Sequence, residues 1–313
     1  MYNSGFWKVK VPVGGAVSTR AAVPVPSDRQ TVEAFDISRD GKWLVFDSNR
    51  DGVQQIFRTP LAGGAVQPLT SDSNPKFKPS ISPDGTEVVY HAIIHGLRRV
   101  FVVGIDGGKP TQLSSGGEAD ERNGGWSPDG RHVAWVVPTA AYYAANQPVG
   151  NYQVRIATRD AKGRWSAPIT MSFGGRMLTP AWADVGTSLI GIDSAWRFVA
   201  QPIAGGPSRP LGSVITVDSM MMPSGVPVTS SDRQMVYFVQ RSQRWGTDAV
   251  RPNGVLEVRR ADGASREVLR FDEPARPHST ASNGIAEYNG WLYFTLSDFQ
   301  SDIWVATVTG LKK

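Results

Sequence analysis

A short turn phrase recurs along the chain, and each copy is followed by an apolar run. The clearest copies are Ile81-Ser-Pro-Asp-Gly85 and Trp126-Ser-Pro-Asp-Gly130, and Ile37-Ser-Arg-Asp-Gly41 is a near copy. Asp-Gly favours a tight turn between antiparallel strands, because both residues accept a positive φ. The following runs, such as Trp43–Phe46 and Val133–Val137, are rich in aromatic and β-branched residues. No sustained 3.6-residue period is present, so the pattern predicts an all-β chain.

The spacing of the turns sets the size of the repeating unit. The turn glycines Gly41, Gly85, Gly130 and Gly186 are 44, 45 and 56 residues apart, and two further periods follow before Gly290. Each unit contains up to four short strands and no helix, which is typical of a β-propeller. We therefore predict an all-β, six-bladed β-propeller with four antiparallel strands per blade, as one domain over residues 1–313. The predicted blades are residues 31–70, 75–113, 121–171, 176–211, 216–270 and 280–308.

The N-terminal segment carries one strand more than its own position in the repeat requires. Residues 6–11 and 16–20, joined by Gly14-Gly15, have the pattern of the outer half of a blade. The last unit has three strands, the third at 302–305, and no fourth before the chain ends. We expect residues 1–20 to supply the closing strand of the C-terminal blade, which also protects a sheet edge. The alternative is a piece of a longer, seven-bladed chain.

The repeat carries a resemblance to a known family. The turn phrase is followed by Ser-Asn-Arg-Asp-Gly at 48–52, Gln-Ile-Phe at 55–57, Gly63-Gly64 and Gln-Pro-Leu-Thr at 67–70. This order resembles the repeat of TolB-like β-propellers, closely over 31–113 and loosely after blade three. The resemblance implies a non-catalytic binding module that contacts other proteins in the periplasm. Propeller domains of prolyl-oligopeptidase-type peptidases have similar repeats, but the Gly-x-Ser-x-Gly motif of their catalytic domain is absent.

Composition narrows the range of partners and compartments. The net charge is +5, but the basic residues are dispersed and the densest basic clusters are dipeptides such as Arg98-Arg99, so no nucleic-acid partner is expected. The absence of cysteine excludes disulfides and thiolate chemistry. No apolar run approaches the ~18 residues of a membrane span, and none at the N-terminus resembles a secretory signal. The expected location is cytoplasmic, or periplasmic if the resemblance holds and a signal has been removed.

Acidic and amide side chains gather near the starts of the predicted first strands, where loops converge at one mouth of the channel. Ca²⁺ binds several such oxygens at once. Six-bladed lactonases of the gluconolactonase and paraoxonase type hold calcium at this place, and the similarity is architectural only. The candidate calcium ligands are Glu33, Glu121, Asn123, Asp218 and Asn283. A calcium ion there could polarise a lactone carbonyl; alternatively, these side chains cap turns and pair with arginines.

Two histidines are the candidate bases of such a hydrolase. His91 and His95 flank the end of the second strand of blade two. On one strand this spacing places both on the same face about 13 Å apart, too far to share a metal ion unless the chain turns between them. The alternative is that both are structural or surface residues.

Two insertions between second and third strands are expected to rise on the same face as the candidate ligands. They contain the candidate substrate-binding residues Tyr142, Tyr143, Trp245 and Arg251. Two functions from different classes follow. The first is a monomeric binding module for a protein partner or small molecule at this face, and the second is a calcium-dependent hydrolase of a lactone or ester.

Overall fold

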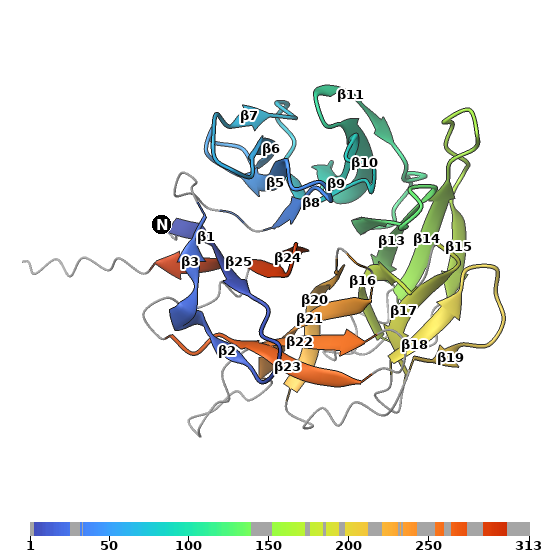
Figure 1. Cartoon of the computed structure of the whole chain (residues 1–313). Helices are drawn as coiled ribbons and strands as arrows, with labels where there is room; N and C mark the ends of the chain where they lie inside the picture. The colour runs from blue at the N-terminus through green and yellow to red at the C-terminus, as the bar shows by residue number, and fades with distance from the viewer. Residues whose placement is uncertain are drawn as a thin grey trace, which may run out of the picture.

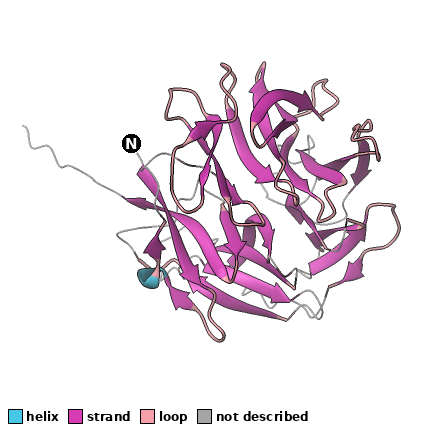
Figure 2. Cartoon of the chain, turned by 45° about the horizontal axis from the view of Figure 1, so that its top comes forward, coloured by secondary structure: helices cyan, strands magenta, loops and turns pink. Residues whose placement is uncertain are grey.

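The computed structural model describes most of the chain, and almost every regular element in it is a strand (Figure 2). The described residues are 3–25, 32, 34–138, 152–172, 176–183, 186–193, 198–211, 221–230, 232, 234–242, 254–259, 264–273 and 284–298. Within them the only helix is one 3₁₀ turn, η1 (Thr19–Ala21), so no helix there has the length or hydropathy to cross a membrane. The strands form six sheets that stand around a central axis (Figure 1). The six-bladed β-propeller predicted from the sequence is confirmed.

Blades one to four contain four antiparallel strands in sequence order, counted outward from the axis. Blade one is β4 (Phe35–Ile37), β5 (Trp43–Ser48), β6 (Gln55–Pro60) and β7 (Gln67–Pro68), and blade two is β8 (Lys76–Ile81), β9 (Glu87–Ile94), β10 (Leu97–Gly104) and β11 (Gly107–Gln112). Blade three is β12 (Arg122–Trp126), β13 (His132–Pro138), β14 (Tyr152–Thr158) and β15 (Ile169–Ser172), and blade four is β16 (Arg176–Trp182), β17 (Ser188–Ile192), β18 (Phe198–Pro202) and β19 (Arg209–Pro210).

Blades five and six differ in the strands at their outer edges. Blade five is β20 (Met221–Thr229), β21 (Met235–Ser242), β22 (Gly254–Arg259) and β23 (Ser265–Arg270), with β2 (Val17–Ser18) added outside. Blade six is β24 (Ile285–Tyr288), β25 (Trp291–Asp298), β1 (Asn3–Lys10) and β3 (Val23–Pro24).

The second strand of each blade is apolar on both faces because it is covered by a neighbouring blade on either side. In β5, Leu44 and Phe46 pack in one buried cluster with residues of blade six, whereas Val45 packs in another with residues of blade two. Successive side chains of a strand point to opposite faces, so a continuous apolar run is what such a sandwiched strand requires.

The recurring Ser-Pro-Asp-Gly turn is fixed by its own side chains. Ser82 donates to the Asp84 carboxylate at 2.6 Å, and the Ser82 hydroxyl accepts the N–H of Glu87 at 2.9 Å. Blade one repeats the first bond between Ser38 and Asp40 at 2.7 Å. That hydrogen bond lowers the pKa of Asp40 to about 2. The carboxylate of Asp40 thus stays ionised and holds the turn that begins the second strand of blade one.

The N-terminal segment closes the ring, as predicted, but it contributes two strands to blade six. β1 pairs antiparallel with β25 from Asn3 opposite Asp298 to Lys10 opposite Trp291, and β3 pairs with β1. β1 therefore occupies the place of the third strand. The run at 302–305, predicted to be that strand, lies outside the described residues.

Residues 16–20 do not extend blade six, in contrast to the prediction. Val17–Ser18 instead lies parallel to β23 of blade five, and the Ser18 hydroxyl donates to Asp272 at 2.6 Å. The Arg266 guanidinium donates to the carbonyls of Pro12 and Val13. The outer edge of β23 offers unpaired backbone groups, and the segment pairs with them before it turns back to blade six.

Candidate functional site

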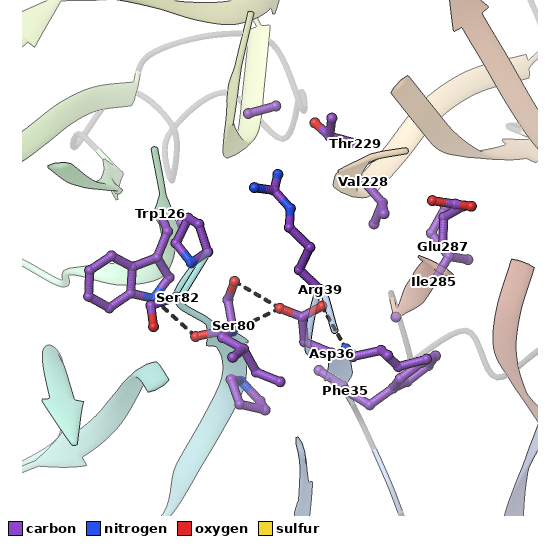
Figure 3. A pocket seen from close by; sticks show the side chains of 18 of the residues that line it. Phe35, Asp36, Arg39, Ser80, Ser82, Trp126, Val228, Thr229, Ile285 and Glu287 are labelled. Carbon is purple, nitrogen blue, oxygen red and sulfur yellow. Dashed lines mark hydrogen bonds between the residues drawn. The ribbon is translucent and has the colours of Figure 1, made fainter. Parts of the chain in front are cut away.

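A cavity of about 210 Å³ lies on the propeller axis, and the innermost strands of all six blades line it (Figure 3). Its lining also includes turns that join first to second strands, with Arg39, Pro83 and Pro128 as members. We call this end of the channel the turn mouth. The sequence predicts the functional residues at the opposite end, where the first strands begin, so the turn mouth is a part of the site that the prediction missed.

Asp36 on β4 joins blade one to blade two in the cavity wall. One of its carboxylate oxygens accepts the N–H of Ile37 at 2.8 Å, and the other accepts the N–H of Ile81 at 2.8 Å and the hydroxyl of Ser80 at 3.1 Å. Burial raises the pKa of Asp36 to about 6, although these hydrogen bonds act in the opposite direction. A carboxyl group in the channel wall therefore changes its charge near pH 6.

Arg39 brings a positive charge to the turn mouth. It occupies the position at which blades two and three carry Pro83 and Pro128. Figure 3 shows its side chain extending from the blade-one wall into the cavity, with Trp126 on one side and Glu287 on the other. The exchange of proline for arginine is visible in the sequence as the departure of Ile37-Ser-Arg-Asp-Gly41 from the repeat.

Two residues of the cavity wall have a left-handed backbone. Lys78 has φ 56° and Asn123 has φ 58°, and each stands seven residues before the turn glycine of its blade. The pairing of β8 and of β12 with its neighbour shifts register across these residues, as in a β-bulge. Such conformations are costly for residues other than glycine and must be held by their surroundings.

Asp47 and His91 hold these two bulges from the preceding blade. Asp47 is fully buried and accepts the N–H of Lys78 at 3.0 Å and that of Ala34 at 2.9 Å. The equivalent residue of the next blade is His91, whose Nδ1 accepts the N–H of Asn123 at 3.4 Å. Each side chain thus fixes an inner strand of the following blade.

His91 is placed as a neutral acceptor. It is 4% exposed and stacks on Phe77 with 5.8 Å between ring centroids. Burial, and then the positive charges of Arg98, Lys78 and Arg122, lower its pKa well below the usual value. This geometry supports a structural role, and His91 is not among the residues that line the cavity.

His95 does not lie on the same strand as His91. β9 ends at Ile94, and His95 sits in the exposed turn before β10 with φ 50°. The spacing expected for two residues on one strand therefore does not apply to this pair, because His95 lies in the turn. A role of either histidine as a base stays a prediction.

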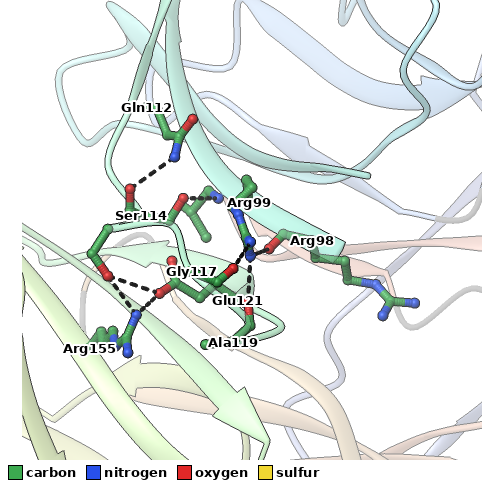
Figure 4. Close-up of polar contacts among 10 residues, drawn as sticks. Arg98, Arg99, Gln112, Ser114, Gly117, Ala119, Glu121 and Arg155 are labelled. Atoms are coloured by element: carbon green, nitrogen blue, oxygen red, sulfur yellow. Dashed lines mark hydrogen bonds and ion pairs between the residues drawn. The ribbon is translucent and has the colours of Figure 1, made fainter. Parts of the chain in front are cut away.

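Glu121 is buried between blades two and three, where it forms an ion pair with Arg155 (Figure 4). Arg99 donates to the carbonyls of Gly117 and Ala119 in the adjoining loop. Glu121 is thus already neutralised by an arginine, which is the alternative that the sequence left open. Of the candidate calcium ligands, Asn123 alone is a described residue that lines the cavity.

The structure describes two of the five candidate calcium ligands, Glu121 and Asn123. In the part of the chain that the structure describes, no group of three Asp, Glu or His side chains is placed to hold a metal ion. Glu33, Asp218 and Asn283 lie outside the described residues, as do the candidate substrate-binding residues Tyr142, Tyr143, Trp245 and Arg251. Calcium binding by the candidate ligands therefore stays a prediction.

Comparison with known proteins decides the family. A model of the TolB beta propeller domain matches residues 30–186, half of the chain. The chain belongs to the TolB β-propeller family. It is also 16% identical to a TolB-type structure from Agrobacterium tumefaciens, with a TM-score of 0.67 over 95% of this chain and 99% of that one. At this identity the likeness shows the fold alone, over almost the whole chain.

Two curated relatives match shorter parts of the chain. An uncharacterized protein of Agrobacterium fabrum is 34% identical over 32% of this chain and 38% of its own length. Tricorn protease homolog 1 of Streptomyces coelicolor is 32% identical over 30% of this chain and 8% of its own length. The match therefore spans well under half of either relative.

Proposed function

We propose that this TolB-type propeller is a binding module that holds part of a partner molecule in its central channel. The observation that carries the proposal is the axial cavity, to which all six blades contribute and in which charged, aromatic and small side chains meet. Convergent polar groups in a concave site are the usual signature of ligand binding.

The size of the cavity favours an inserted side chain or a short chain segment. Its volume of about 210 Å³ is below the roughly 300–1,000 Å³ of pockets that enclose a drug-sized ligand. A partner protein that inserts one or two side chains would leave the remainder of its contact to the face around the mouth. A protein partner is therefore favoured over a free small molecule.

The wall of the cavity is preorganised for binding. Asp36, Asp47 and His91 each link one blade to an inner strand of the next through side-chain-to-backbone hydrogen bonds. A site that is already ordered loses little conformational entropy when a ligand enters. The family likeness also favours a periplasmic location, which fractionation of the source cells tests, and the monomeric state stays a prediction.

Site-specific photocrosslinking in the source organism tests the proposal. A benzoylphenylalanine at Pro83 is expected to form a discrete adduct, since this residue lines the cavity at the turn mouth. The control carries the same group at Lys109, which is exposed on the outer strand β11. An equal adduct pattern from both positions, or none from position 83, would contradict binding in the channel.

A further inference from the structure

We propose that the turn mouth is selective for a ligand that presents a carboxylate group, with Arg39 as the specificity-determining residue and Lys78 as a second positive group in the cavity wall. This role rests on the proposed function and names the chemistry of the ligand. Among the described residues, four charged ones line the cavity: Asp36, Arg39, Lys78 and Glu287.

Both acidic groups are directed at backbone donors of the propeller itself. The Asp36 carboxylate accepts two backbone N–H groups and the Ser80 hydroxyl. Glu287 accepts the N–H of Gly290 at 2.7 Å and thereby caps the turn of blade six. These hydrogen bonds give both carboxylates a structural role in the cavity wall.

Arg39 has the chemistry and the position to recognise a carboxylate. A guanidinium presents its N–H donors in a planar fork that matches the two oxygens of a carboxylate. Arg39 is exposed, and in Figure 3 its guanidinium end extends into the cavity. Pro83 and Pro128 stand at the same repeat position and line the same cavity, so blade one supplies a donor group where these two blades supply apolar rings.

Lys78 adds a second, independent observation. Its backbone is held in a left-handed conformation by Asp47, at a bulge that redirects the inner strand of blade two. Bulges and strained residues of this kind are concentrated where a side chain must be aimed at a ligand. The same bulge occurs at Asn123 in blade three, and in blade two it carries a lysine into the cavity lining.

A carboxylate could come from an acidic side chain of a partner protein or from a free small acid. Three probes separate these sources. They are the peptide N-acetyl-Gly-Ser-Glu-Glu-Ser-Gly-amide, its Gln-Gln counterpart, and glutarate. Binding is followed by calorimetry and by the fluorescence of Trp126 and Trp182, which line the cavity.

The acidic peptide is expected to bind at least about tenfold more tightly than the Gln-Gln peptide, the ratio that one charge-assisted hydrogen bond supplies. Arg39→Gln should bring the ratio close to one, and Arg39→Lys should restore part of it. The matched control is Lys42→Gln, which removes one positive charge from the same turn at a side chain that is 74% exposed and does not line the cavity.

Equal affinities of the two peptides, together with no binding of glutarate, would overturn the inference. An acidic preference that Arg39→Gln leaves unchanged, or that Lys42→Gln removes equally, would also overturn it. Binding of glutarate alone, lost in Arg39→Gln, would support the carboxylate site and assign it to a free acid. If crosslinking from position 83 captures a partner while no probe shows acidic preference, the proposed function stands and the carboxylate inference fails.

Discussion

Replacing Gly41 by alanine should damage the seam between blades one and six. Gly41 has φ 68°, and a Cβ atom added there would lie 2.1 Å from Cζ of Tyr288. The Tyr288 hydroxyl donates to the Asp40 carbonyl at 3.3 Å, so the ring rests on the turn of blade one. The substitution therefore introduces backbone strain and also displaces the tyrosine from the turn mouth.

A matched position separates these two costs. Gly85 is the equivalent turn residue of blade two, with φ 75° and open space around the added Cβ. Gly85→Ala should lower the free energy of unfolding by about 1–2 kcal/mol through backbone strain alone. Gly41→Ala should lower it by about 1–2 kcal/mol more, from the lost hydrogen bond and packing of Tyr288.

Urea unfolding of both variants and of a Gly41→Ala/Tyr288→Ala double mutant measures the difference. In the Tyr288→Ala background, the cost of Gly41→Ala should fall to that of Gly85→Ala, because the obstructing ring is gone. Equal losses in the two single glycine variants, or no coupling between positions 41 and 288, would refute the role assigned to Tyr288.

Three further predictions concern buried polar groups. Asp47→Ala should cost about 2–4 kcal/mol of unfolding free energy, because two backbone N–H groups lose a buried acceptor, while Asp51→Ala on the exposed loop should change it by less than about 0.5 kcal/mol. Glu121→Ala should cost about 3–5 kcal/mol by leaving the Arg155 guanidinium without its carboxylate partner, equally with calcium and with chelator; a loss confined to calcium-containing buffer would instead support the calcium prediction. Asp36 has a folded-state pKa of about 6, above its usual 3.8, so its contribution to stability should decline as pH rises through this window, by up to about 3 kcal/mol at pH 7. Urea midpoints of wild type and Asp36→Asn at pH 5 and pH 8 test this, and an identical pH dependence of the two proteins would contradict it.

The fold could be predicted from the sequence because its determinants are local and repeated. The Ser-Pro-Asp-Gly turn is held by bonds between residues only a few positions apart, as between Ser82 and Asp84. The apolar run that follows the turn indicates a strand whose two faces are both buried. Both signals recur with a period close to 45 residues, so the number of blades follows from counting.

The pairing of the strands in blade six and the positions of the site residues depend on contacts between distant parts of the chain. No local sequence pattern indicates these contacts. β1 pairs with β25 across almost the whole chain, and the run at 302–305 has an equally good strand pattern. Glu121 lies just before the bulge in β12. A bulge interrupts the alternation of side chains between the two faces of the sheet, so the sequence does not indicate which face Glu121 takes. Arg39 can be recognised in the sequence as a departure from the repeat. Only the structure shows that this position lines the axial cavity.

The pairing of β1 with β25 also determines the order in which this protein can fold. β1 is synthesised first, yet its partner is completed only at Asp298. At about 5–20 residues per second, the strand waits about 15–60 s on the ribosome with Phe6 and Val9, both buried in the finished ring, still exposed to water. The blade that is begun first is therefore the one finished last, and ring closure is the step of folding at which the nascent chain most needs protection from aggregation.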